Sequence, residues 1–280
     1  SVRGAGRRLM ADNTNAEGAV GTGPMEFTED GFVGGTGYGS DGDGTGHDFV
    51  AWCWKAGNGT VENSDGTIAS TVSVNQDAGF SIVSYEGTGV VNSTVGHGLG
   101  VKPDLIIIKN REEGSAFWSV IHSAISGTST SDTNMLYLNS TNAQADDTNI
   151  YGDNIPNTTT FGVDDYRGVN YSGENQIAYC WHSVEGFSKF GSYEGNGNAN
   201  GPFVYLGFKP ALVIVKIITA AERWYMWDNK RNPTNPVYKY LMADASSAEG
   251  ASYTGGILDF VSNGFKLREA SGTYWNNASH

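Results

Sequence analysis

The chain has 280 residues, of which 39 are glycine and 17% are charged, and its formal net charge at pH 7 is −13. This composition is typical of turn-rich β proteins, and an aromatic content of 12% is enough to fill β-sandwich cores. The negative charge disfavours nucleic acid and anionic lipid surfaces as partners. No apolar run is long enough to span a bilayer, so we expect no membrane insertion.

Residues 1–54 are predicted to form the C-terminal half of a first β-sandwich unit. Short strands are expected around Arg8 to Met10 and around Gly31 to Val33, and a longer one is expected over residues 49–54. Apolar side chains alternate onto both faces of that longer strand, which is typical of a strand inside a fold. Residues 55–78 are polar and rich in turn signals, so they are predicted to be a linker or an added hairpin.

Residues 79–181 are predicted to form a complete antiparallel β-sandwich unit of jelly-roll or concanavalin A-like type. Roughly six or seven short strands of β-branched and aromatic residues follow one another at intervals typical of sandwiches. The apolar run over residues 105–109, preceded by Pro103, predicts a central strand. No stretch of this unit has the apolar period of an amphipathic helix.

Residues 182–280 repeat the order of the complete unit. The segment that begins at Gly79 returns at Gly186, and the strand that ends at Lys109 returns at Lys216, both at an offset of 107 residues. Such internal repetition is typical of tandem units. The closing strand has no counterpart before residue 280, so this unit is predicted to lack its last strand. That strand would follow in a longer chain or come from another subunit.

The first 54 residues fit the same frame. Residues 9–16 match residues 136–143 at an offset of 127, and residues 9–12 match residues 241–244 at an offset of 232. The offset of 127 also places Cys53 and Cys180 at equivalent positions in two units. Both thiols are therefore predicted to be free and buried in separate cores, too far apart for a disulfide.

Four motifs follow one another in the complete unit. They are Gly-Phe-Ser-x-Val-x-Tyr-x-Gly-x-Gly at 79–89, Leu-Gly-x-Lys-Pro-Asp-Leu-Ile-Ile-Ile-Lys-Asn at 99–110, Leu-Tyr-Leu-Asn at 136–139 and Ala-Tyr-Cys-Trp at 178–181. Together they resemble a repeated domain of bacteriophage tail-fibre and other virion structural proteins of marine-phage type, and the resemblance touches nearly the whole chain. It implies a structural or host-recognition role on a virion that assembles in the bacterial cytoplasm. It also implies other virion proteins and further copies of the chain as partners, and no catalytic motif.

The sequence predicts no catalytic centre. Glu86 and Glu194 occupy the same position in two units, so they would form the carboxylate pair that a glycan hydrolase uses only if the two units pack face to face. The five histidines lack the spacing of a transition-metal site, and neither a nucleophilic serine motif nor a phosphate-binding glycine loop is present. We therefore expect a protein that is not an enzyme.

An acidic loop is a candidate calcium site. Asp41, Asp43 and Asp48 supply carboxylates, and the glycines between them permit tight wrapping around an ion. The loop lacks the bidentate glutamate expected at its end, so the alternative is a polar hairpin loop. No other cofactor is expected.

The stretch over residues 224–231 is a candidate glycan-binding surface. Aromatic rings stack on the apolar face of a sugar, and carboxylate and guanidinium groups bind its hydroxyls. The candidate contacts are Tyr225, Trp227, Asp228 and Arg231. The alternative is core packing, because Trp224 aligns with Trp118 of the preceding unit.

These observations favour a virion structural protein, a fibre or surface appendage of β-sandwich units that attaches to host-surface glycans through many weak contacts. Two alternatives stay open. One is a lectin-like carbohydrate-binding module of a secreted bacterial protein, and the other is a glycan hydrolase whose carboxylates are not evident from the sequence.

Overall fold

The protein is almost entirely antiparallel β-structure. The computed structural model describes residues 2–4, 6–19, 26–33, 48–125, 134–146, 150–251, 257–269 and 275–278. Within these ranges the one helix is a single turn, α1 (Arg167–Asn170), and no helix is long and apolar enough to cross a membrane. The predicted all-β, antiparallel fold class is confirmed.

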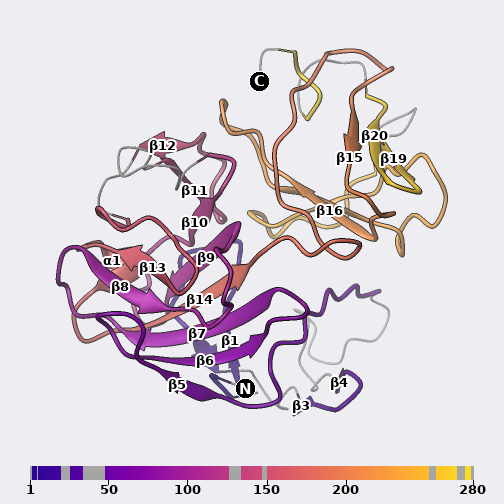
Figure 1. Cartoon of the computed structure of the whole chain (residues 1–280). Helices are drawn as coiled ribbons and strands as arrows, with labels where there is room; N and C mark the ends of the chain where they lie inside the picture. The colour runs from indigo at the N-terminus through magenta and orange to yellow at the C-terminus, as the bar shows by residue number, and fades with distance from the viewer. Residues whose placement is uncertain are drawn as a thin grey trace.

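The largest sheet has eight strands and is shown from purple to salmon in Figure 1. Its order is β12-β11-β10-β9-β14-β7-β6-β5. The strands are β5 (Val61–Asn63), β6 (Ser70–Asn75), β7 (Phe80–Glu86), β9 (Leu105–Asn110), β10 (Ser119–His122), β11 (Asn134–Tyr137), β12 (Ala145–Asp146) and β14 (Asn175–Trp181). The predicted central strand is confirmed as β9, which pairs with β10 on one side and β14 on the other.

A smaller sheet of β8 (Ser93–Gly96) and β13 (Thr160–Val163) forms the second layer. The core of this unit gathers alternate side chains of the large sheet, such as Ile106 and Ile108, with Val95 and Phe161 of the smaller one. The odd-numbered residues of β9 point to the opposite face of the large sheet, because successive side chains of a strand alternate. That outer face carries the contacts between units described below.

Most of the segment predicted as a linker or an added hairpin is a hairpin. β5 and β6 pair with each other, and β6 pairs with β7 over its whole length. The hairpin therefore widens the large sheet beyond the strands that the repeat predicts, and it covers the edge of β7.

Residues 203–267 build two three-stranded sheets around a second core. One sheet has the order β15 (Phe203–Tyr205), β20 (Gly264–Leu267), β19 (Leu258–Val261), and the other has the order β16 (Leu212–Val215), β17 (Tyr225–Asp228), β18 (Leu241–Met242). Trp227, Ile257 and Leu267 are fully buried between them. In the described part of the chain, β16 pairs with β17 alone, whereas the equivalent strand β9 has a neighbour on each side.

Equivalent residues of the two units make the same internal contacts. The Tyr85 hydroxyl donates to the Val169 carbonyl at 2.6 Å, and the Tyr193 hydroxyl donates to the Trp275 carbonyl at 2.8 Å. Each bond ties the start of its unit to the segment near the unit's end. These matched contacts support the interpretation that residues 79–181 and 182–280 are copies of one module.

The first 54 residues match the prediction in part. Their strands are two short pairs, β1 (Arg7–Arg8) with β2 (Gly18–Ala19) and β3 (Glu26–Phe27) with β4 (Phe32–Val33). β4 confirms the strand predicted around Gly31 to Val33, and β1 overlaps the one predicted around Arg8 to Met10.

The strand predicted over residues 49–54 is wrong, because this segment is irregular, with Phe49 66% and Trp54 44% exposed. A strand that is apolar on both faces has to lie within a sheet that is covered on both sides, and the described residues supply no such sheet here. For the same reason Cys53 is exposed, contrary to the prediction, whereas Cys180 is buried as predicted.

Candidate functional site

The candidate functional site is the contact between successive units. Three stretches share the pattern Leu-x-x-Asp/Asn-x-Thr/Ser-x-Ala-Glu/Gln, and we call them the first ribbon (9–17), the second ribbon (136–144) and the third ribbon (241–249). The first ribbon contacts the second unit (residues 79–181), and the second ribbon contacts the third unit (residues 182–280). The two contact regions are called the first and second junctions.

An indole N–H of the following unit donates to each ribbon. Trp118 Nε1 lies 3.0 Å from the Met10 carbonyl oxygen, and Trp224 Nε1 lies 2.9 Å from that of Tyr137. Met10 and Tyr137 occupy the same position in the two ribbons. Both tryptophans are buried, so each bond satisfies a donor that would otherwise lose its contact with water.

A lysine ammonium donates to each ribbon at the carbonyl four residues after the one that accepts the indole N–H. Lys109 Nζ donates to the Thr14 carbonyl at 3.0 Å, and Lys216 Nζ donates to the Thr141 carbonyl at 3.2 Å. Burial lowers the pKa of each lysine to about 8. The two junctions thus hold ammonium groups at equivalent positions, fully buried at Lys109 and partly buried at Lys216.

A backbone bond closes each junction. The amide of Glu17 donates to the Arg111 carbonyl at 2.7 Å, and that of Gln144 donates to the Ile218 carbonyl at 2.8 Å. Here the side chains differ, because Arg111 forms an ion pair of 2.7 Å with the Glu17 carboxylate while Gln144 faces an isoleucine. Burial alone would raise the pKa of Glu17, but hydrogen bonds from Arg111 and Arg3 hold it below its usual value.

The second junction also contains an apolar cluster. Trp224, Ile218 and Ala243 of the third unit belong to one cluster with residues on the outer face of the large sheet. Those residues are Leu105, Ile107, Val120, Ile125, Leu136 and Leu138. Apolar burial therefore adds to the three hydrogen bonds in holding the second and third units together.

Two of the candidate glycan contacts lie in the core of the third unit. Trp227 is 0% and Tyr225 8% exposed, and their rings are stacked with centroids 5.7 Å apart and an interplanar angle of 15°. Trp275 packs edge-on against both rings. In this geometry neither ring has a free face for a sugar, which supports the packing alternative.

The other two candidate contacts, Asp228 and Arg231, build the turn after β17. The Asp228 carboxylate accepts the backbone amides of Lys230 and Arg231 at 2.9 Å and the Arg231 Nε at 2.6 Å. Burial alone would raise the pKa of Asp228, but these bonds lower it. The Arg231 guanidinium also donates to the Met226 carbonyl and lies 5.7 Å from the centre of the Trp52 ring.

The acidic candidates are not brought together within the described residues. Asp41 and Asp43 lie outside them, and Asp48 is exposed. In the described ranges no group of three His, Cys, Asp or Glu residues is placed to hold a metal ion. Calcium binding by this loop therefore stays a prediction. Glu86 and Glu194 are exposed at equivalent positions of the two units.

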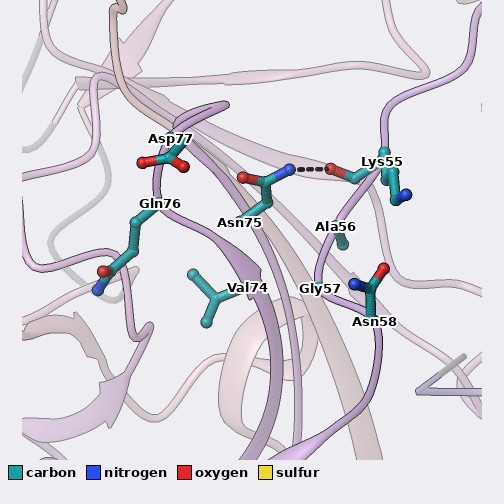
Figure 2. A pocket seen from close by; sticks show the side chains of 8 residues that line it. All are labelled: Lys55, Ala56, Gly57, Asn58, Val74, Asn75, Gln76 and Asp77. Atoms are coloured by element: carbon teal, nitrogen blue, oxygen red, sulfur yellow. Dashed lines mark hydrogen bonds between the residues drawn. The ribbon is translucent and has the colours of Figure 1, made fainter.

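An open depression of about 590 Å³ lies beside the added hairpin. It is lined by residues 55–58 and 74–77, and Asn75 Nδ2 donates across it to the Lys55 carbonyl at 3.3 Å (Figure 2). Figure 2 shows the Lys55 ammonium and the Asp77 carboxylate on opposite sides of Asn75. Because these charged groups do not converge, the depression is less informative about function than the junctions.

Sequence reasoning missed the junction residues. Lys109 and Lys216 end equivalent apolar strands, and Trp118 and Trp224 follow them at nearly the same distance, so the repeat itself carried the signal. The acceptors of the indole and ammonium bonds are backbone carbonyls, so the side-chain pattern of the ribbons shows that these loops repeat but not which of their atoms make contact. Only the indole and ammonium donors could have been predicted.

The fold is that of an all-β protein with antiparallel, sandwich-like sheets, and its two junctions use matching hydrogen bonds. Residues 1–280 match the model of a family described as a domain of unknown function (DUF7483), and the chain belongs to this family. The searches of curated proteins and of solved structures found no match.

Proposed function

We propose that the protein is a structural component of a bacteriophage virion, a fibre or surface appendage in which β-sandwich units are joined in a linear array. One observation carries the proposal: both junctions use the same three hydrogen bonds at equivalent positions. The donors are Trp118, Lys109 and Glu17 at the first junction and Trp224, Lys216 and Gln144 at the second.

Repeated contacts of this kind are expected of a protein that works as architecture. Each junction joins a ribbon to a different surface, the outer face of the next unit, so the contact is heterologous and can be repeated from unit to unit. In such arrays stability comes from the units and from the interfaces between neighbours. The placement on a phage particle rests on the resemblance of the motifs at 79–89 and 99–110 to virion proteins.

Host attachment is the second part of the proposal. An array displays its loops many times, so weak contacts with surface glycans sum to useful avidity. The expected partners are other virion proteins, further copies of this chain and host-surface glycans.

Particle composition tests the proposal. Phage particles from a host that produces this chain would be purified on a density gradient and analysed by mass spectrometry, and gold-labelled antibody against residues 79–181 would locate the chain by electron microscopy. We expect the chain in intact particles, on a tail or a surface appendage. Its absence from washed particles would contradict the proposal, and glycan binding or sugar release by the purified chain would then favour the lectin or the hydrolase alternative.

A further inference from the structure

The third ribbon is uncovered where the first two are covered. Residues 246–249 are all exposed, whereas the equivalent residues 14–17 and 141–144 are at least partly buried except for Asn15 and Asn142. Residues 241–249 follow the same pattern as the ribbons that form the two junctions. The third ribbon is thus a junction surface without a unit on it in the described part of the chain.

The apolar face beside the third ribbon is also open. Ile214 is 45% exposed, although its equivalent on the second unit, Ile107, belongs to the apolar cluster of the second junction. Leu212, Met226 and Leu241 are partly exposed at positions equivalent to other members of that cluster. On the second unit these positions are covered by Trp224 and its neighbours.

The acceptor for an indole is present on the third ribbon. The Met242 carbonyl accepts the amide of Ala245 at 3.4 Å, just as the Tyr137 carbonyl accepts that of Ser140 at 3.3 Å. At Tyr137 the carbonyl also receives the Trp224 indole. Because a carbonyl oxygen has two lone pairs, Met242 can receive a second donor in the same way.

The charge at the end of the third ribbon indicates which kind of unit fits. The first and third ribbons both contain Leu-Met-Ala-Asp and end in Ala-Glu, whereas the second ribbon ends in Ala-Gln. Glu17 is held by Arg3 from its own side and by Arg111 of the next unit. Glu249 is held by Arg231 and Lys239 of its own unit, at 3.4 and 3.0 Å, and its side chain is 32% exposed.

We propose that the third ribbon and the face around Ile214 bind a further unit of the second unit's type. Such a unit presents an indole N–H to the Met242 carbonyl, an ammonium to the Ser246 carbonyl and a guanidinium to the Glu249 carboxylate. The inference rests on the proposed array and adds that the junctions alternate, an Arg–Glu junction followed by a neutral one. Alternating charge at successive interfaces fixes the order in which units bind one another. A charged surface that meets a neutral one leaves a buried charge without a partner.

The test uses the full chain with a substitution that releases the first ribbon from the outer face of the second unit. In Glu17→Arg, the arginine repels Arg111, so the first ribbon is released and the face becomes available to the third ribbon of another copy. We expect head-to-tail association, seen in light scattering as a molar mass that rises with concentration. The dissociation constant should be lower than that of the unchanged chain by about tenfold or more.

Two double variants separate this contact from non-specific association. Glu17→Arg with Glu249→Arg should lose the association, since Arg111 of one copy then meets an arginine on the other. Glu17→Arg with Glu194→Arg should keep it, because Glu194 is an exposed acid of the same unit outside the third ribbon. Equal association by both double variants would overturn the proposal.

A milder variant covers the case in which Glu17→Arg does not fold. Glu17→Gln places at position 17 the residue that the second ribbon carries at 144, so the fold should accept it. It should still associate more tightly than the unchanged chain, and adding Glu249→Arg should abolish the gain. No gain for any folded variant would overturn the inference. These measurements use purified protein, so a failure here is distinct from absence of the chain from phage particles.

Discussion

Lys109 is a charged residue in a fully buried position. Its ammonium donates to the carbonyls of Thr14, Ala116 and Glu113, at 3.0, 2.9 and 3.4 Å. Three carbonyl dipoles replace water around the charge, yet they do not compensate in full, because burial lowers the pKa of this lysine to about 8. The first junction therefore has a titratable group at its centre.

Substitution of this lysine should change how stability depends on pH. From about pH 8 to 10.5 the unfolded chain binds more protons at Lys109 than the folded protein does. The penalty for the buried charge is therefore complete below about pH 8 and is relieved as the pH rises, by about 1 kcal/mol per pH unit. The free energy of unfolding should rise over this window for the unchanged chain relative to Lys109→Met.

Denaturant titrations at several pH values would measure that difference. Tyrosines and Lys216 titrate in both proteins, so their contributions cancel in the comparison. Lys109→Met should also be less stable at pH 7, because three carbonyls lose their donor. Identical pH slopes for the two proteins would contradict the assignment of this pKa.

The two cysteines should differ in reactivity. Cys53 is exposed, whereas Cys180 is buried and its pKa is raised to about 12 by burial. We expect a thiol reagent to modify Cys53 alone in the folded protein at pH 8 and both residues after unfolding. Mass spectrometry of the labelled peptides measures this, with Cys53→Ser as the control that should remain unlabelled when folded. Rapid labelling of Cys180 in the folded chain would be inconsistent with the structure.

At the scale of elements, a glycine permits the closest contact within each unit. A side chain at Gly87 would collide with the Tyr171 carbonyl, and one at the equivalent Gly195 would collide with the Asn277 carbonyl. Both contacts join the start of a unit to the segment near its end. The backbone cannot approach so closely at either place if a Cβ atom is present.

Alanine at Gly195 should therefore destabilise the third unit. We expect Gly195→Ala to lower the free energy of unfolding by about 2 kcal/mol, because backbone must move to admit the methyl group. Gly191→Ala is the matched control, since a Cβ there meets no atom within 4 Å. Calorimetry would compare the two, and equal melting temperatures would argue against the close contact at 195.

The elements that could be predicted from sequence are those whose own side chains determine where the strand lies and which of its faces is buried. A β-branched run after Pro103 identified β9, and alternation placed Trp224 and Met226 opposite Tyr225 and Trp227. The segment 49–54 could not be predicted in this way, because the same alternation needs two covering sheets that this segment lacks. The Tyr225–Arg231 stretch was ambiguous for a related reason, since aromatic rings beside charged groups fit a sugar platform and a core edge equally well.

At the scale of the whole molecule, the described residues form two separate cores that an apolar cluster links. Figure 1 shows the third unit, in orange and yellow, beside the large sheet of the second. Trp224 is the largest side chain of that cluster, and it also donates the indole bond to Tyr137. The stability of the two units should therefore be coupled through this side chain.

Removal of the Trp224 ring should uncouple the units. We expect Trp224→Ala to cost about 3 to 5 kcal/mol and to divide unfolding into two transitions, one for each core. Trp54→Ala is the control, because Trp54 is 44% exposed and its loss should change stability by less than about 1 kcal/mol. Urea unfolding followed by fluorescence and by circular dichroism would show whether the probes separate. Coincident curves for Trp224→Ala would mean that the units are coupled elsewhere.

The junctions place different evolutionary constraints on their two sides. The ribbon groups that accept the indole and ammonium donors are main-chain carbonyls, and such a group survives a change of side chain, as methionine at position 10 and tyrosine at 137 illustrate. The donors have no such freedom, because an indole N–H and an ammonium are each supplied by one residue type. Ribbon loops can thus accumulate substitutions while the joint keeps its geometry, which would let an exposed surface diversify without loosening the array beneath it.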